Sequence, residues 1–324
     1  MKKENQATTN PYPYSDTNKR YYTYDYYLKQ TFGGKCAKIP LDAGMTCPNI
    51  DGRCSTGGCI YCSGRGSGDF AAAPTLSIEE QYEQVRQRLS HKWSVDKCIP
   101  YFQAHTNTYA PLPRLRSLFE TALNLPGAVG LNVATRADCL EPDVLEYLSE
   151  LSERTILTIE LGLQSAHDRT ADLINRGHTW AQFCQGYENL RAANKNIHIC
   201  VHLIFGLPGE TREDMLTTVR CVAALRPHQV KIHLLHVLQG TSLADMYLAG
   251  EYEPMDRQDY IETVAEALTL LPPDTVIGRL TGDGMAEHLL APEWSRRKVS
   301  VINDIDKLLF LNGWYQGIHF DNEK

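Results

Sequence analysis

Four of the ten cysteines in this 324-residue chain lie within sixteen consecutive residues, and this cluster is the segment best suited to chemistry. The segment reads CPNIDGRCSTGGCIYC and contains Cys47, Cys54, Cys59 and Cys62. Thiolates bind zinc and iron–sulfur clusters, and the spacing of Cys59 and Cys62 lets both reach corners of one metal site. Four thiolates suit a structural zinc ion, whereas three suit a 4Fe–4S cluster with one open iron. The cluster alone leaves both metals as alternatives, together with a set of thiols that bind no metal.

The composition predicts a cytoplasmic protein without a membrane anchor. Hydrophobic residues make up 43% of the chain, the formal net charge is -7, and no apolar run is long enough to span a membrane. The N-terminus is polar and interrupted by proline, unlike a secretory signal. In a reducing cytosol, clustered cysteines favour metal binding over disulfides, and we expect the scattered ones to be buried apolar side chains. The acidity argues against a broad nucleic-acid surface but leaves room for a local basic groove.

Strand-like and helix-like segments alternate along the chain and predict an α/β fold with a parallel sheet. The expected strands are near-continuous apolar runs, typical of strands buried on both faces. They cover Ala37–Leu41, Lys97–Gln103, Val129–Thr135, Thr155–Gly162, Ile197–Gly206, Gln229–Val237 and Thr275–Leu280. The expected helices begin at Ser77, which forms a capping box with Glu80, and cover Leu112–Leu123, Asp143–Leu151, Trp180–Ala193, Arg212–Leu225 and Asp259–Leu270.

Six or seven such units predict a full or partial (β/α) barrel with its active site at the carboxyl ends of the strands. We expect three parts. Residues 1–30 form a polar, tyrosine-rich segment that starts as a mobile tail and then docks on the barrel. Residues 31–280 form the barrel, and residues 281–324 form a C-terminal extension that covers one end of it.

The order of several motifs resembles the radical S-adenosylmethionine (SAM) superfamily, its Elongator-catalytic-subunit-like branch, and within that branch the bacterial YhcC/YtqA (MnmL-like) family. That branch has a long first gap in its cysteine motif, as here, where eleven residues separate Cys47 from Cys59 and Tyr61 takes the aromatic position before Cys62. The later landmarks are YFQAHTNTYAPL (101–112), ATRADCL (134–140), ELGLQSAHDRT (160–170), INRGHT (174–179), HLIFGLPGE (202–210) and LLAPEW (289–294). The resemblance covers most of the chain and implies a partial barrel of the radical SAM type.

The resemblance also implies that Cys47, Cys59 and Cys62 hold a 4Fe–4S cluster whose open iron binds SAM. Cys54 falls at a position that the family pattern does not require, so the four-cysteine zinc site becomes the less favoured alternative. In most of the superfamily a Gly-Gly-Glu-like segment contacts the methionine amine of SAM. Gln103 and Asn107 occupy its place here, and the glutamate is missing.

Four further residues are candidates for binding SAM. Glu160 and Gln164, at a predicted strand end, suit the two ribose hydroxyls because both side chains accept hydrogen bonds. Arg176 suits the methionine carboxylate, which its guanidinium can bind through two parallel bonds. Gly206 allows a tight turn near the ligand. A fifth candidate is His236, at the end of a predicted strand. The resemblance implies that the backbone at this position contacts the adenine of SAM. Structural roles for each of these residues remain alternatives.

Arg136 and Arg279 lie at predicted strand ends, and we expect them to anchor a substrate carboxylate or phosphate, with rim ion pairs as the alternative. The resemblance implies an enzyme that cleaves SAM reductively, forms a deoxyadenosyl radical and converts a carboxymethylaminomethyl group on a tRNA wobble uridine to aminomethyl. Its partners would be tRNA and an electron donor of the flavodoxin or ferredoxin type. Radical SAM chemistry on a small molecule or protein, and a non-catalytic metal-binding module, are the alternatives.

Overall fold

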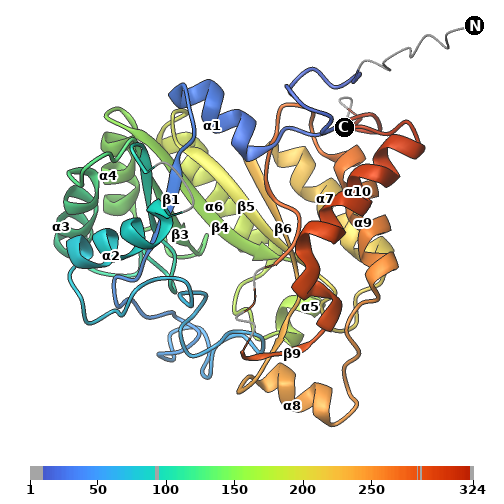
Figure 1. The fold of residues 1–324 in the computed structure, drawn as a ribbon. Coiled ribbons are helices and arrows are strands. Elements are labelled where there is room, and N and C mark those ends of the chain that lie inside the picture. The colour runs from blue at the N-terminus through green and yellow to red at the C-terminus, as the bar shows by residue number, and fades with distance from the viewer. Residues whose placement is uncertain (1–9, 92–94, 283, 285–286, 322–324) are drawn as a thin grey trace, which may run out of the picture.

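The computed structural model describes residues 10–91, 95–282, 284 and 287–321, and its central element is a curved sheet of seven parallel strands (Figure 1). The strands lie in the order β1-β2-β3-β4-β5-β6-β8, so each one pairs with its neighbours in the chain. Their bounds are β1 Ala37–Leu41, β2 Cys98–Phe102, β3 Gly130–Thr135, β4 Ile156–Gln164, β5 His198–Phe205, β6 Gln229–Leu234 and β8 Val276–Arg279. All seven predicted strands are therefore present, and the fold is the predicted α/β partial barrel.

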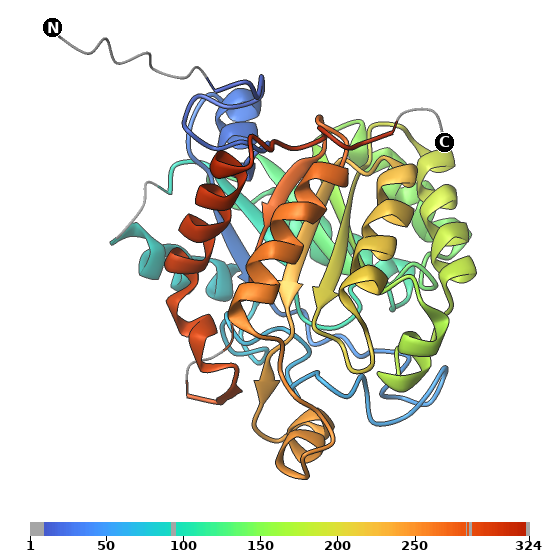
Figure 2. The ribbon, with the colours of Figure 1, turned by 90° about the vertical axis from the view of Figure 1, so that its right-hand side faces the viewer.

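Helices cover the outer face of the sheet, as Figure 2 shows for α7, α9 and α10. The helices that follow the strands are α2 Ile78–Ser90, α3 Leu112–Leu123, α4 Pro142–Ser152, α5 Asp168–Leu173, α6 Trp180–Ala193, α7 Arg212–Leu225 and α9 Arg257–Leu270. The predicted capping box of Ser77 and Glu80 begins α2. The main core lies between sheet and helices and contains fully buried residues such as Leu131, Ile159 and Val201. Since the outward strand faces fill this core, the inward faces are left to form the site.

The sheet does not close into a full barrel, because no hydrogen-bonded ladder joins β8 to β1 among the described residues. The tyrosine-rich segment lies against this open side. Thr23 forms a parallel bridge with Ile277 of β8, and helix α1 (Tyr24–Phe32) then leads into β1. Gln316 fixes the segment from the other end of the chain, because its Oε1 accepts a hydrogen bond from the Tyr22 N–H at 2.9 Å. Residues 1–9, at the start of the predicted mobile tail, lie outside the described residues.

Two features after β6 differ from the sequence prediction. The strand expected over Gln229–Val237 ends at Leu234, and the chain turns so that β7 (Val237–Leu238) pairs antiparallel with β9 (Leu289–Ala291). The remaining elements are α8 Ser242–Leu248, the 3-10 helix η1 Glu293–Arg297 and α10 Lys298–Leu311. Helix α10 packs beside α9 in the outer layer, through Val301, Ile305 and Leu309, instead of lying across the strand ends (Figure 2). No helix in the described part of the chain has the length and apolar character needed to cross a membrane.

Candidate active site

A cavity of about 540 Å³ occupies the inside of the partial barrel and extends from the loop after β1 to helix α1. Cys47, Cys59 and Cys62 all line this cavity. The side chains that follow the carboxyl ends of the other strands also line it, including Gln103, Arg136, Gln164 and Arg279. Carboxyl strand ends are where barrels of this kind bind ligands, so the cavity is the candidate active site.

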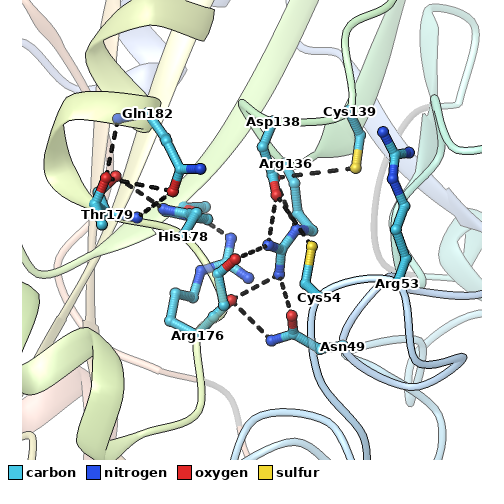
Figure 3. A network of polar contacts seen from close by, with 12 residues as sticks. Asn49, Arg53, Cys54, Arg136, Asp138, Cys139, Arg176, His178, Thr179 and Gln182 are labelled. Atoms are coloured by element: carbon cyan, nitrogen blue, oxygen red, sulfur yellow. Dashed lines mark hydrogen bonds and ion pairs between the residues drawn. The ribbon is translucent and has the colours of Figure 1, made fainter.

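The cysteine loop, which follows β1, is held against the segment after α5 by Asn49 (Figure 3). The fully buried Asn49 amide donates from Nδ2 to the carbonyls of Asn175 and Arg176, at 2.6 and 2.8 Å. The same Nδ2 lies 3.5 Å from the Sγ atom of Cys59. Gly177 makes this approach achievable, because a Cβ at that position would lie 2.3 Å from Asn49 Oδ1. One asparagine therefore fixes the position of a candidate cluster ligand.

Arg136 lies behind this loop and donates all five of its N–H groups to protein acceptors (Figure 3). Nε and Nη2 form a fork on Asp138, at 2.8 and 2.7 Å. Nη1 donates to Asn49 Oδ1 and to the Arg176 carbonyl, and Nη2 also donates to the Gly177 carbonyl. This geometry does not support the expectation that Arg136 anchors a substrate carboxylate, since no N–H remains for an external anion. Arg136 instead holds the cysteine loop to its neighbouring segment.

The surroundings of the three cysteines favour thiolate formation at one of them. The pKa of the Cys59 thiol is held well below its usual value by a hydrogen bond with Cys62, with further lowering by the positive charges of Arg176 and Arg136. Cys54 differs, because its side chain is exposed, its Sγ lies 3.8 Å from Asp138, and burial and that carboxylate raise its pKa. The same hydrogen bond, together with burial, raises the pKa of Cys62 well above its usual value, so the Cys59–Cys62 pair places its thiolate at Cys59.

The spacing of possible ligand atoms bears on the zinc site that the sequence left open. A single zinc ion bound at about 2.3 Å by each thiolate needs its sulfur atoms within about 4 Å of one another. Among the described residues, the three-ligand group whose ligand atoms all lie within 4.8 Å of one another is Glu160, Cys200 and His202, and the cysteine loop contributes no such group. In the part of the chain that the structure describes, the cysteine loop therefore shows no preformed three-thiolate zinc site.

Three predicted SAM contacts lie at the cavity wall near the cysteines. Gln103, Gln164 and Arg176 all line the cavity. The Arg176 guanidinium contacts the Gly162 carbonyl through Nη2, while its buried Nε has no hydrogen-bond partner among the described residues. A Cβ at position 162 would lie 2.9 Å from Gln164 Nε2 and 3.0 Å from Arg176 Nη2, so glycine lets the ends of both side chains take their observed positions.

Two predicted contacts lie away from the cavity. Asn107 is fully buried behind the strand ends, where its Nδ2 donates to the carbonyls of Phe102, Ala104 and Ala134. Gly206 adopts a φ of 87° in the turn after β5, and its carbonyl accepts a 2.8 Å hydrogen bond from the Tyr252 hydroxyl. Neither residue lines the cavity, and the geometry supports structural roles for both. A sequence motif can predict that a residue lies in a turn near the site, but it does not show whether that residue faces the ligand or the protein interior.

His236 lies in a smaller cavity of about 170 Å³ that adjoins the first. The two share lining residues, including Cys62, Gln103 and Arg279. The His236 ring lies close to Gly282 and Gly284, since a Cβ at Gly282 would lie 2.7 Å from its Cε1 atom and one at Gly284 would lie 2.9 Å from its Nδ1 atom. His236 therefore faces the site, at its edge.

Glu160 lies at the floor of the main cavity and already has a partner for each lone pair. Oε1 accepts from Asn132 Nδ2 at 2.7 Å and contacts Lys38 Nζ, while Oε2 contacts Lys231 Nζ at 2.5 Å and His202 Nε2 at 2.8 Å. Although burial favours the neutral acid, the two lysines hold the pKa of Glu160 well below its usual value. The geometry therefore does not support the expected bonds from Glu160 to ribose hydroxyls.

The sequence analysis missed several residues of this floor. Lys38, Tyr101, His202 and Lys231 line the cavity beside Glu160. Lys38 and Lys231 stand inside strands β1 and β6, and a charged residue within a strand buried on both faces is the signal that would have located them.

Comparisons with known proteins identify the fold and the family. A Radical SAM superfamily profile matches residues 49–222, and a Radical_SAM C-terminal domain profile matches residues 227–310. The chain belongs to the radical SAM superfamily. It is 46% identical to the uncharacterized protein YtqA of Bacillus subtilis, with 96% of each chain covered, and 33% identical to protein YhcC of Escherichia coli K12, with 88% of this chain and 91% of that protein covered. These relatives place this radical SAM protein in the YhcC/YtqA family.

More distant proteins share the same fold. Elongator complex protein 3 of Homo sapiens is 27% identical over 73% of this chain and 49% of its own length. The solved structure of archaeal Methanocaldococcus infernus Elp3 matches with a TM-score of 0.63 and 18% identity, covering 87% of this chain and 64% of that one. This likeness establishes the shared partial-barrel fold.

The residues at the cysteine loop of this radical SAM protein fit the cofactors that the family implies. Three thiols line one wall, and the buried Nε–H of Arg176 has no partner among the described residues, which suits the carboxylate of SAM. When bound, a 4Fe–4S cluster and SAM supply a deoxyadenosyl radical. The protein supplies orientation and electrostatics and excludes water.

Proposed function

We propose that this radical SAM enzyme modifies a tRNA wobble uridine by converting its carboxymethylaminomethyl group to aminomethyl. Cys47, Cys59 and Cys62 would hold the 4Fe–4S cluster, and Gln103, Gln164 and Arg176 would contact SAM. The observation that carries the proposal is that these side chains line one cavity inside the barrel. The similarity to Elongator complex protein 3 and the resemblance to the MnmL-like family support the choice of substrate. The proposal includes a cytoplasmic location, where tRNA and an electron donor of the flavodoxin or ferredoxin type are found.

The proposed reaction balances as an oxidative removal of the carboxymethyl group. A hydrogen atom leaves the carbon between the amine and the carboxylate and is taken up as deoxyadenosine forms. Loss of a second electron and a proton gives an imine, and this electron replaces the one that the donor spent on cleaving SAM. Water then adds to the imine, the carbon–nitrogen bond breaks, and the products are the aminomethyl group and glyoxylate. SAM and water are thus the co-reactants consumed.

A matched pair of cysteine variants tests the assignment of the cluster. Anaerobically reconstituted enzyme should contain about four irons per chain and form deoxyadenosine when given SAM and a reductant. Cys59→Ser should lose both, because a serine hydroxyl does not replace the thiolate. Cys54→Ser should keep both, since its thiol is exposed and points at Asp138. Loss of iron in both variants, with bound zinc instead, would support a zinc module.

The tRNA substrate is tested separately. Nucleosides of tRNA from a deletion strain should accumulate the carboxymethylaminomethyl form, and the purified enzyme with SAM and reductant should convert it and release glyoxylate. Mass spectrometry follows the nucleosides, and a variant with Cys59→Ser is the control. An unchanged wobble-uridine profile, with deoxyadenosine formation intact, would point to a small-molecule or protein substrate.

A further inference from the structure

The floor of the cavity carries more positive than negative charge. Lys38 of β1 and Lys231 of β6 approach Glu160 of β4 from opposite sides, and Arg279 at the end of β8 lines the same cavity. The side chains are 21%, 9% and 0% exposed for Lys38, Lys231 and Glu160. The other acidic residue that lines the cavity in the described chain is Asp25 of α1, which pairs with Lys29. Two lysines therefore share one carboxylate at the floor, and Arg279 lines the same cavity.

The other titratable groups of the floor do not reverse this balance. Burial and Lys231 lower the pKa of His202 to about 4, and burial, His202 and Arg279 lower that of His233, so both imidazoles are neutral near pH 7. Burial lowers the pKa of Lys38 to about 7, although Glu160 favours its charged form. The Glu160 carboxylate is thus shared by Lys231 and, when it is protonated, Lys38, and a second anion would stabilise protonated Lys38.

The shape of the floor also suits a bound anion. The Tyr101 ring lies beneath both ammonium groups, with its centroid 3.7 Å from Lys38 Nζ and 5.1 Å from Lys231 Nζ, so the ring holds both cations in place without adding a negative charge. The His233 ring lies 5.1 Å from that of His202, and its buried Nε2 has no hydrogen-bond partner among the described residues. A neutral imidazole N–H at this position can donate to an entering oxygen.

We propose that Lys38, Lys231 and Arg279 bind a carboxylate of the substrate at the floor of the cavity, with His233 as an additional hydrogen-bond donor. This inference rests on the proposed function, in which the group to be removed ends in a carboxylate. Binding there would place the carbon next to that carboxylate within the cavity that the cysteines also line. In this proposal, the substrate carboxylate is bound by residues on β1, β6 and β8 and not by Arg136.

The test measures binding of two nucleosides to the full-length protein by calorimetry, one with the carboxylate and one without. The wild-type protein should bind 5-carboxymethylaminomethyluridine at least about tenfold more tightly than 5-aminomethyluridine. Lys38→Met and Arg279→Met should each reduce this preference to less than about threefold. Lys307→Met, which removes an exposed cation on α10, should leave it unchanged. Circular dichroism establishes that each variant is folded, and Lys38→Met leaves the Lys231–Glu160 pair in place.

The outcomes separate this inference from the proposed function. Equal binding of the two nucleosides by the wild-type protein, or an undiminished preference in both folded variants, would overturn the carboxylate site. A preference that depends on Lys38 and Arg279, together with an unchanged tRNA profile in the deletion strain, would keep the site and reject the tRNA substrate. Deoxyadenosine formation without substrate should be the same in Lys307→Met and the wild type, because Lys307 is exposed on α10 and does not line the cavity.

Discussion

Replacing Arg136 by methionine should destabilise the protein and lower its iron content, because this guanidinium fixes the cysteine loop. The substitution removes the guanidinium donor from the Asp138 carboxylate, Asn49 Oδ1 and two backbone carbonyls, all around a side chain that is 2% exposed. Breaking a buried ion pair by removing one partner costs about 3–5 kcal/mol. We therefore expect a loss of about 3–5 kcal/mol in the free energy of unfolding and less than half of the wild-type iron after reconstitution.

The assay combines urea unfolding of the apoprotein with iron analysis after anaerobic reconstitution. Arg53→Met is the matched control, because Arg53 belongs to the same region (Figure 3) but pairs at the surface with Glu141, and such pairs contribute about 1 kcal/mol or less. Arg136→Lys should fall between the two, since an ammonium group keeps the charge but not the fork on Asp138. If Arg136→Met resembled Arg53→Met in stability and iron content while raising the KM for substrate, the reasoning would be refuted and Arg136 would be a substrate anchor.

Three further substitutions test other parts of the structure. Gly177→Ala should reduce iron content, because its Cβ would lie 2.3 Å from Asn49 Oδ1 and its φ of 73° disfavours alanine; full iron occupancy would contradict this. Glu160→Gln should lower the free energy of unfolding in urea by about 3–5 kcal/mol, because Lys38 and Lys231 lose the negative charge that they share. A loss below about 1 kcal/mol would be inconsistent with this network. Burial lowers the pKa of His228 to about 4. Between pH 6.5 and 4, this histidine is therefore protonated in the unfolded chain but neutral in the folded protein. The free energy of unfolding then falls as the pH falls, by at most about 1.4 kcal/mol per pH unit. His228→Gln should flatten this acid dependence, and unfolding curves with the same pH slope as the wild type would refute it.

The sequence predicted the strands and the cysteine motif because both are local signals. A parallel strand buried on both faces is an apolar run, and β3 or β5 can be recognised without knowing its neighbours. The roles of Arg136 and Glu160 depend instead on partners far away in the chain. Arg136 follows the end of β3, as predicted, whereas Glu160 lies in the middle of β4 and not at its end. Asn49 and the two lysines of the floor use up the hydrogen-bonding capacity of these side chains. Position along a strand thus predicts that a side chain faces the cavity, but not whether it has a bond left for a ligand.

The two ends of the cavity differ in a way that bears on substrate choice. At the strand ends, polarizable thiols stand beside Arg176, whereas the floor presents compact ammonium groups held over an aromatic ring. In our proposal, the substrate side chain reaches from the cysteine end of the cavity to the floor, and its reacting carbon lies between the two. The floor therefore selects substrate side chains by their length and by their terminal charge. A side chain that lacks the terminal anion could enter the cavity but would leave Lys38 and Lys231 competing for Glu160. The two ammonium groups would then repel each other without a second anion between them. Selectivity for a carboxylate would come from this repulsion as much as from the attraction between the lysines and the ligand.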